Sequence, residues 1–208
     1  MTSIPRVQLQ DLLPLCESGL FEVCRIDPIW FSPQLLDDML SAVLYRYPLI
    51  TKDGYESYKS ICLQHREGAE NPLYDDVEQR QGVVVGGTLR KGVPARGFCD
   101  RRTVVGEHFS FLWDTPLSDH VVLLRGRIMQ ALPGFEMNWH NDGLDNRRIH
   151  IPIRTNPECL LEYQSGNSYH MPADGSIYVV NASGEHRAVN RSDHPRTHLT
   201  FSFLPVIG

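Results

Sequence analysis

The sequence predicts a mainly β fold, an antiparallel sandwich or barrel of the jelly-roll type. After Phe98 the chain is a series of short stretches that are rich in β-branched residues or alternate apolar with polar residues. Turn-forming pairs such as Asp174-Gly175 separate these stretches. Short strands with many turns are typical of double-sheet jelly rolls. The length of 208 residues suits one structural domain, which we divide into a scaffold of helices and strands packed on the barrel (1–100) and a jelly-roll core (101–208).

Two helices are expected in the first 50 residues. A short one over residues 7–15 should stop near Pro14, because proline disrupts a helix interior. A longer one should begin at Ser32-Pro33, a capping residue followed by proline at the first helical position, and end at Tyr47-Pro48. We expect Asp37-Asp38 on its solvated face. Its apolar residues recur at helical spacing and should pack on a sheet: Leu35, Leu36, Met39, Leu40, Val43 and Leu44.

The middle of the chain is harder to interpret. Residues 52–80 are polar and their pattern is ambiguous; it is compatible with a mobile connection. The run Gly-Val-Val-Val-Gly-Gly that begins at Gly82 predicts a strand that enters a turn. This run lacks the Gly-Lys-Ser/Thr of a phosphate-binding loop, which argues against a nucleotide site.

The second half should contain the strands of the jelly roll. Turn signals such as Pro133-Gly134 separate the expected strands. A further run, which ends at His140 and Asp142, should also be a strand. The other expected strands are 121–129, 147–154, 159–163, 176–181 and 196–204.

Composition and charge argue against several kinds of partner. The net charge of −5 and the pI near 6.0 give no reason to expect nucleic acid or an anionic membrane. No apolar run approaches the roughly 20 residues that cross a bilayer, and residues 1–6 lack the pattern of a signal peptide. An odd number of scattered cysteines favours free thiols and a cytoplasmic location over disulfides or structural zinc: Cys16, Cys24, Cys62, Cys99 and Cys159.

The stretch from Trp139 to Asp142 carries the clearest chemical signal. His140 and Asp142 are two positions apart, and on a β-strand such residues project from the same face. A second imidazole, from His186, would complete a set of two histidines and one carboxylate. This set, with its other coordination positions open, is typical of non-haem Fe(II) oxygenases. The alternative is a surface ion pair between His140 and Asp142, with His186 as a turn residue satisfied by the backbone.

A chelating cosubstrate and oxygen would take the open positions of such a metal. If the cosubstrate is a 2-oxo dicarboxylate, its far carboxylate needs a cation, and an arginine fork is the best geometric match. Arg196 begins the last expected strand and could return to the pocket. Arg148 and His150 are a further i, i+2 pair that could line the same wall or orient a ligand. The structural alternative for Arg196 is a salt bridge to Asp193 or Glu185.

These residues also form blocks that resemble a known family over roughly residues 120–204. The blocks are Trp139-His140-Asn-Asp142, Arg148-Ile-His150-Ile-Pro152-Ile, Thr155-Asn156-Pro157, Asp174-Gly175, Gly184-Glu-His186-Arg-Ala-Val-Asn190-Arg-Ser192 and Pro195-Arg196-Thr-His198-Leu199. In this order they resemble the aspartyl/asparaginyl β-hydroxylases, which are Fe(II)/2-oxoglutarate-dependent oxygenases. Bacterial members of that family include free-amino-acid hydroxylases such as the proline hydroxylases. Its vertebrate peptidyl hydroxylases lack the acidic ligand, so Asp142 is a feature of the small-molecule branch.

The resemblance implies a double-stranded β-helix and an enzyme. The implied reaction uses O2 to decarboxylate 2-oxoglutarate to succinate and CO2 while a C–H bond of the prime substrate is hydroxylated, with ascorbate as the reductant in vitro. The implied iron ligands are His140, Asp142 and His186. The implied cosubstrate residues are Arg196, as the anchor of the C5 carboxylate of 2-oxoglutarate, with Arg148 and His150 nearby.

The substrate is the least determined part of the sequence prediction. A short chain without repeats favours a free amino acid or a small amino-acid-derived metabolite, for which Arg125, Arg127 and Asp145 could hold the charged groups. One alternative is a peptide or carrier-tethered aminoacyl substrate. An alternative of another class is a cupin-like metal- or ligand-binding module without turnover. The sequence leaves the oligomeric state open.

Overall fold

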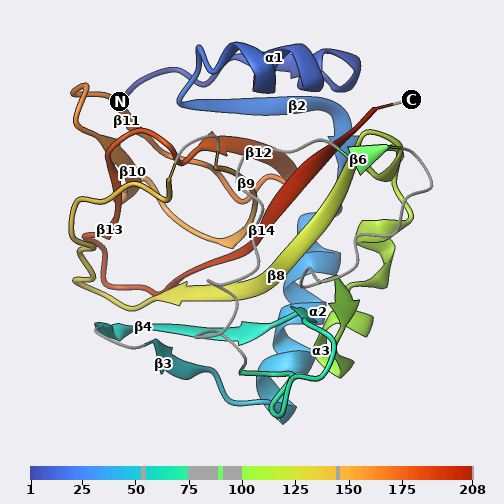
Figure 1. Cartoon of the computed structure of the whole chain (residues 1–208). Coiled ribbons are helices and arrows are strands. Elements are labelled where there is room, and N and C mark those ends of the chain that lie inside the picture. Colours follow the sequence, from blue (N-terminus) through green and yellow to red (C-terminus); the bar gives the residue numbers. More distant parts are fainter. Residues whose placement is uncertain (53–54, 75–88, 91–99, 144–145, 208) are drawn as a thin grey trace.

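The computed structural model describes residues 1–52, 55–74, 89–90, 100–143 and 146–207. Most strands of this part of the chain form one large sheet in the order β1-β2-β12-β9-β14-β8-β4-β3, with β6 beside β14 (Figure 1). The bounds in this sheet are β1 Arg6–Gln8, β2 Val23–Trp30, β3 Ile50–Lys52, β4 Tyr55–Cys62, β6 Leu89–Arg90, β8 Val121–Ala131, β9 Arg147–Arg154, β12 Ser176–Asn181 and β14 Arg196–Ile207.

A smaller sheet packs against the main one, in the order β11-β10-β13. Side chains of both sheets share one buried cluster, to which Met129 and Val180 contribute from the main sheet and Leu161 and Ala188 from the smaller one. The predicted mainly β jelly roll is therefore confirmed. The remaining strands are β10 Cys159–Tyr163, β11 Ser168–Tyr169 and β13 His186–Asn190, with β5 Gln64–His65 paired to β7 Arg101–Arg102.

Alternation along β9 gives the main sheet two different faces. Ile149, Ile151 and Ile153 are buried in the large apolar core on one face. Arg148 and His150, one position out of phase, line a cavity on the other face. Because successive side chains of a strand point to opposite faces, one sequence run supplies both a core and a site.

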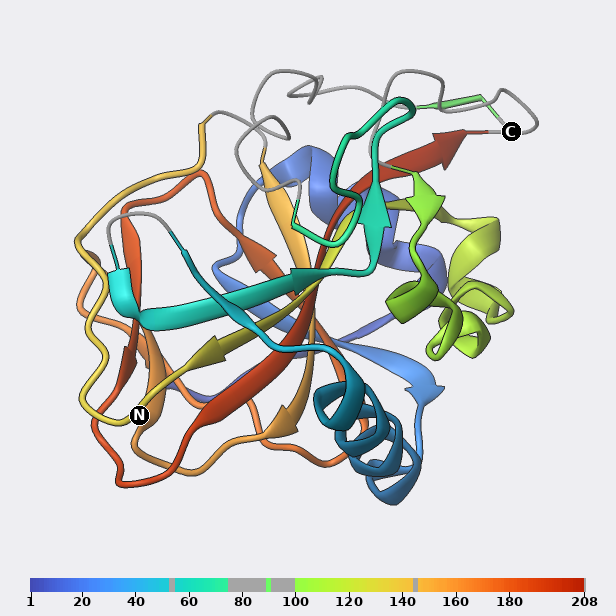
Figure 2. The same cartoon turned by 90° about the horizontal axis from the view of Figure 1, so that it is seen from below.

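Helices cover the apolar face of the main sheet (Figure 2). Helix α2 begins as predicted, since the Ser32 side chain accepts a hydrogen bond from the backbone N–H of Leu35. Leu36 and Leu40 of α2 are fully buried in the core, whereas Leu35 is 40% exposed. The helical segments are α1 Leu12–Ser18, α2 Pro33–Arg46 and α3 Val104–Glu107, with 3₁₀ turns η1 Leu9–Asp11, η3 Ser110–Trp113 and η4 Pro116–Asp119.

Two predictions for the first half of the chain were wrong. The helix expected over residues 7–15 is replaced by β1 and η1, and α1 then runs from Leu12 to Ser18. Pro14 lies in the first turn of α1, where a backbone N–H has no partner within the helix, so the proline does not stop it. The helix ends instead at Gly19, whose φ of 63° is left-handed.

The segment 52–80, whose pattern was ambiguous and was interpreted as a mobile connection, contains β4. This strand pairs with β3 on one side and β8 on the other. Its buried residues include Ser60, which the strand register places opposite Met129. The strand expected from Gly82 lies outside the described residues.

The acidic pair of α2 is not wholly a solvated face. The Nε of Arg154 lies 2.6 Å from Oδ1 of Asp37, and this ion pair ties α2 to β9. Asp38 accepts a hydrogen bond from Gln34 within the helix.

Strands from the first 100 residues are integral to the main sheet. β2 pairs with β12, and β4 pairs with β8. The division into 1–100 and 101–208 stays a prediction. Within the described residues, no helix has the length and apolar character to cross a membrane.

Candidate metal and cosubstrate site

His140, on a loop, lies beside His186 of the smaller sheet, and the centres of the two rings are 4.5 Å apart. His186 is the first residue of β13. The backbone N–H of each residue donates to the carbonyl of the other, at 3.1 and 2.8 Å. The run up to Asp142 is not the strand that was predicted, since only isolated bridges occur at Glu136 and His140. The bridge at His140 nevertheless brings His140 next to His186, as the predicted strand was expected to do.

Asp142 completes the cluster that the sequence predicted. Its backbone N–H donates to the carbonyl of Ala182 at 2.9 Å, which holds the loop against the end of β12. One side-chain ligand atom from each of His140, Asp142 and His186 lies within 4.8 Å of the other two. These three residues form a possible metal site.

Hydrogen bonds fix which ring nitrogens are available to a metal. Nδ1 of His140 lies 2.9 Å from the carbonyl of Asn138, and Nδ1 of His186 lies 2.8 Å from the carbonyl of Gly184. A carbonyl only accepts, so each neutral ring has its hydrogen on Nδ1 and a lone pair on Nε2. Histidine ligands of metals are commonly oriented by such contacts. The donor set therefore fits a divalent transition metal.

The two oxygens of Asp142 have different partners. Nε of Arg148 donates to Oδ2 at 2.6 Å, and Oδ1 lies 3.8 Å from Nε2 of His140. Burial alone would raise the pKa of Asp142. The charge and hydrogen bond of Arg148, with smaller contributions from His186 and His140, instead lower this pKa to about 2. Asp142 is thus an anion with one oxygen directed toward the histidines.

A cavity of about 110 Å³ connects the three residues to the other predicted ones. His140, Asp142 and His186 line it at one place. The remaining lining comes from both sheets and comprises Tyr58, Arg127, Met129, Met137, Arg148, His150, Leu161, Val180, Ala188, Arg196 and Thr200. The structure therefore brings all six predicted site residues to one cavity.

Arg196 is a buried cation, with 5% of its surface exposed. Its Nη2 lies 3.1 Å from Nδ1 of His198. Among the described residues, no carboxylate pairs with Arg196. The predicted alternatives are otherwise engaged, since Asp193 lies 3.4 Å from His194 and Glu185 accepts from Asn141. The guanidinium therefore lines the cavity without a compensating anion from the part of the chain that the structure describes.

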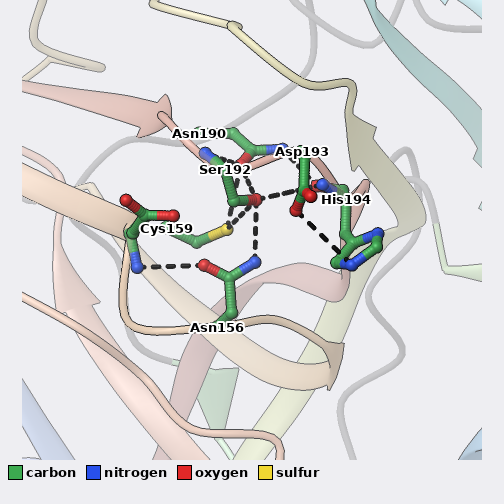
Figure 3. Close-up of polar contacts among 7 residues, drawn as sticks. Asn156, Cys159, Asn190, Ser192, Asp193 and His194 are labelled. Atoms are coloured by element: carbon green, nitrogen blue, oxygen red, sulfur yellow. Dashed lines mark hydrogen bonds and ion pairs between the residues drawn. The ribbon is translucent and has the colours of Figure 1, made fainter.

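A polar network occupies the turn between β13 and β14, which leads into Arg196; Figure 3 shows its contacts among Asn156, Asn190 and Ser192. The Asn190 amide donates to the carbonyls of Ala131 and His194, at 3.0 and 2.8 Å. The Asn190 side-chain oxygen accepts from the backbone N–H of Ser192 at 3.1 Å. The Ser192 hydroxyl accepts from Asn156 at 2.7 Å. These contacts join β8 and the ends of β13 and β9 to the turn that leads into Arg196.

His198 and Thr200 are two residues near the site that the sequence prediction did not single out. Both share the cavity-facing phase of β14 with Arg196, so the i, i+2 rule applied from Arg196 would have indicated them. His198 is 1% exposed and lies behind the lining, beside His150. Asp145, suggested for a substrate, lies outside the described residues.

Trp139, beside the motif, is neither core nor lining. It is 39% exposed, and the guanidinium of Arg187 lies 4.6 Å from the centre of its ring. Arg187 also forms ion pairs with Glu136 and Glu162. This arrangement secures the loop that carries His140 to β13 and β10.

Comparisons with known proteins indicate the family and the fold of this chain. Residues 111–205 match the family model described as aspartyl/asparaginyl beta-hydroxylase. The resemblance expected from the motif blocks is therefore confirmed. No curated protein matches the chain.

Several solved structures share the fold. An oxidoreductase of the 2OG-Fe(II) oxygenase family from Burkholderia pseudomallei is 15% identical, with a TM-score of 0.56 and coverage of 98% of this chain and 95% of that one. HygX from Streptomyces hygroscopicus, with nickel and 2-oxoglutarate bound, is 11% identical, with a TM-score of 0.57 and coverage of 94% and 86%. A Pseudomonas putida prolyl-4-hydroxylase is 10% identical, with a TM-score of 0.54 and coverage of 93% and 98%. Such low identities show the fold alone.

Proposed function

We propose that this chain, whose residues 111–205 carry the aspartyl/asparaginyl β-hydroxylase domain, hydroxylates a C–H bond of a free amino acid or a small amino-acid-derived metabolite. The chain is an enzyme, a 2-oxoglutarate-dependent hydroxylase that uses Fe(II) and O2. Iron supplies the oxidative chemistry when bound. The finer parts of the proposal are the substrate class, a cytoplasmic location and the roles of individual residues.

In this proposal, His140 and His186 bind Fe(II) through Nε2 and Asp142 binds it through Oδ1. The support is the donor set, because both histidines hold their Nδ1 hydrogen against a backbone carbonyl. Arg148 neutralises Asp142 and keeps the carboxylate turned, through its hydrogen bond to Oδ2. Two histidines and one carboxylate leave positions for a bidentate cosubstrate and oxygen.

The observation that carries the cosubstrate assignment is the buried guanidinium of Arg196. A buried cation without an anion is unfavourable, and among the described residues Arg196 has no carboxylate partner. The C5 carboxylate of 2-oxoglutarate would supply one through a two-pronged hydrogen bond. Arg196 lines the same cavity as the metal cluster, so a dicarboxylate chelating the metal can extend toward it.

The support for a small substrate comes from the size of the cavity, which is about 110 Å³. The cavity is small, and its apolar lining includes Met129, Met137 and Leu161. HygX has been solved with hygromycin B bound, with a TM-score of 0.55 to this chain. A cavity of this size favours a small prime substrate over a bulky one.

Succinate formation tests the reaction. Purified protein with Fe(II), ascorbate and 2-oxoglutarate is screened across the free amino acids. We expect one compound or a related group to stimulate succinate formation and to gain one oxygen atom by mass spectrometry. His140→Ala should abolish both signals. Slow succinate formation that no amino acid stimulates would shift the search to peptide or carrier-tethered substrates. Iron-loaded protein that forms no succinate would contradict the catalytic proposal.

A matched pair of arginine variants tests the cosubstrate anchor. Arg196→Lys keeps the charge but loses the fork, and we expect it to raise the KM for 2-oxoglutarate at least tenfold, about 1.4 kcal/mol. Arg191→Lys is the control, since Arg191 is half-exposed and pairs with Glu162 at the surface. Equal KM values for Arg196→Lys and the control would contradict the assignment.

A further inference from the structure

Strand β8, which lies between β14 and β4 in the main sheet (Figure 1), changes phase part of the way along its length. Leu123 and Ile128 are both buried in the large apolar core, although an odd number of positions separates them. Arg127 and Met129 line the cavity on the other face. In a regular strand Arg127 would share the face of Leu123, because alternate residues project from one face. One extra residue must therefore lie between Leu123 and Arg127.

The strand register locates this extra residue. β14 advances by two residues from Thr200 to Ser202, while β8 advances by three between their partners, Arg127 and Leu124. This difference of one residue defines a β-bulge. Within the bulge Arg125 has a φ of 53°, a left-handed conformation that is unfavourable for a residue with a side chain. The surrounding structure must hold the bulge in place.

The side chain of Gln64, at the start of β5, supplies hydrogen bonds to the bulge. Gln64 is 1% exposed. Its amide nitrogen donates to the carbonyl of Leu123 at 2.8 Å, and its side-chain oxygen accepts from the backbone N–H of Gly126 at 2.9 Å. The backbone N–H of Leu63 donates to the carbonyl of Gly126 at 2.7 Å. Gln64 thus joins the backbone on both sides of Arg125, and its loss would leave buried backbone groups without these partners.

The bulge determines which face of the sheet receives Arg127. Arg127 is 3% exposed and pairs in register with Thr200, which also lines the cavity. A guanidinium offers several N–H donors and a hydroxyl offers one more, so the two side chains together suit a carboxylate. Arg196 is proposed to bind the C5 carboxylate of 2-oxoglutarate. Arg127 therefore suits a different carboxylate in the same cavity.

We propose that Gln64 is a positioning residue: it stabilises the bulge of β8, and the bulge directs Arg127 into the cavity, where the guanidinium binds a carboxylate. The proposal rests on the proposed function only for the source of that carboxylate, which is either the cosubstrate or an amino-acid substrate. Gln64 lies outside residues 111–205, which match the family model. The first half of the chain thereby contributes to the ligand-binding face.

The hold of Gln64 on Arg127 is measured without metal or ligand. ¹⁵N relaxation of the arginine Nε–H groups in metal-free protein reports how rigidly each guanidinium is held, and the Arg127 signal is assigned from its loss in Arg127→Lys. We expect a rigid Arg127 in the wild type and a mobile one in Gln64→Met, which fills a similar volume without the hydrogen bonds. A mobile Arg127 in the wild type, or a rigid one in folded Gln64→Met, would overturn the proposal.

Thr103→Val is the matched control for this measurement. The hydroxyl of Thr103 is buried and donates to the carbonyl of Cys62 at 2.8 Å, close to Gln64 in the chain. Its removal takes away a buried hydrogen bond without touching the bulge, so we expect Arg127 to stay rigid in this variant. A mobile Arg127 in Thr103→Val would show that any loss of stability in this region has the same effect, and would overturn the specific role of Gln64.

A double-mutant cycle tests whether Gln64 acts through Arg127. Calorimetry gives the Kd of 2-oxoglutarate for Mn(II)-loaded protein, and succinate formation gives the KM of an amino acid that stimulates it. We expect Arg127→Met to raise one of these constants at least about tenfold, because a charge-assisted hydrogen bond is lost. Gln64→Met should raise the same constant by less, and should have no effect on it in the Arg127→Met background.

The two constants distinguish the sources of the carboxylate. A rise in the Kd identifies the cosubstrate, and a rise in the KM alone identifies the amino-acid substrate. Both constants unchanged in Arg127→Met, or equal effects of Gln64→Met in both backgrounds, would contradict the proposal. If Gln64→Met does not fold, the Arg127→Met titration and the wild-type relaxation decide. Because the relaxation measurement uses neither metal nor cosubstrate, its failure is distinguishable from failure of the succinate assay.

Discussion

The carboxylate of Asp142 owes its low pKa to Arg148. Burial would raise this pKa, but the guanidinium lowers it to about 2 from an ordinary value of 3.8. A folded-state pKa below the unfolded value contributes stability that is fully present above pH 4 and is lost as the pH falls through 2. The difference of nearly two pKa units corresponds to about 2 kcal/mol at neutral pH. Asp142 thus stabilises the metal-free fold as well as completing the metal cluster.

We therefore expect a pH-dependent effect of Asp142→Asn on metal-free protein. The variant should lower the free energy of unfolding by about 2 kcal/mol at pH 6. This difference from wild type should fall to roughly half at pH 3, because the wild-type carboxylate then loses part of its advantage. Urea unfolding at both pH values measures the difference. A difference that does not change between pH 6 and pH 3 would assign the effect to packing instead.

At the scale of elements, the turn between β13 and β14 determines where Arg196 lies. Asn190 is fully buried and satisfies the carbonyls of Ala131 and His194. Removal of one partner from buried hydrogen bonds costs about 1–3 kcal/mol. Loss of the Asn190 side chain would also remove the hydrogen bonds that hold the turn leading into Arg196.

Asn190→Ala should accordingly change two properties together. We expect a loss of about 1–3 kcal/mol in the free energy of unfolding and weaker binding of 2-oxoglutarate to the metal-loaded protein. Denaturant unfolding and calorimetric titration measure the two effects. Asp193→Asn is the control in the same turn, because the Asp193 side chain is 87% exposed, and we expect it to change neither. Full 2-oxoglutarate affinity in Asn190→Ala would show that the turn is not needed to place Arg196.

The strands show which parts of the fold could be predicted from the sequence. The bounds of β9 and β12 were predicted correctly because their apolar runs lie between clear turn signals. β4 was missed, since Glu56, Lys59 and Ser60 hide its alternation, and its pairing with β3 and β8 makes it a strand. Pairing between distant segments is a tertiary property, which a local pattern does not contain.

For the site, the residue types and their spacing were sufficient to predict which residues come together. The local backbone geometry was predicted wrongly. His140 and Asp142 were grouped by an i, i+2 rule that assumes a strand, but the structure has a loop there. His186 meets them through a backbone bridge to His140, which no sequence spacing reveals. His198 could have been found from its i, i+2 spacing to Arg196, but its contact with His150 of β9 is tertiary.

For the whole molecule, the site joins the two sheets. His186 comes from the smaller sheet, Arg196 and Arg148 come from the main sheet, and His140 comes from the loop between β8 and β9. Unfolding of either sheet separates the proposed ligands. Any metal or cosubstrate that binds only the folded arrangement must then stabilise the entire chain by mass action.

We expect Fe(II), or Mn(II) as an oxygen-insensitive probe, to raise the melting temperature of the whole chain in one cooperative transition. At a metal concentration 100 times the Kd, linkage gives about 2.7 kcal/mol, and 2-oxoglutarate should add a further increase only after the metal is bound. His140→Ala should abolish both increases, whereas His194→Ala, at a side chain that is 78% exposed, should retain them. Scanning calorimetry with and without a chelator measures the shifts. An equal metal-induced shift in His140→Ala would place the metal elsewhere, because the two remaining side chains cannot hold it with the same affinity.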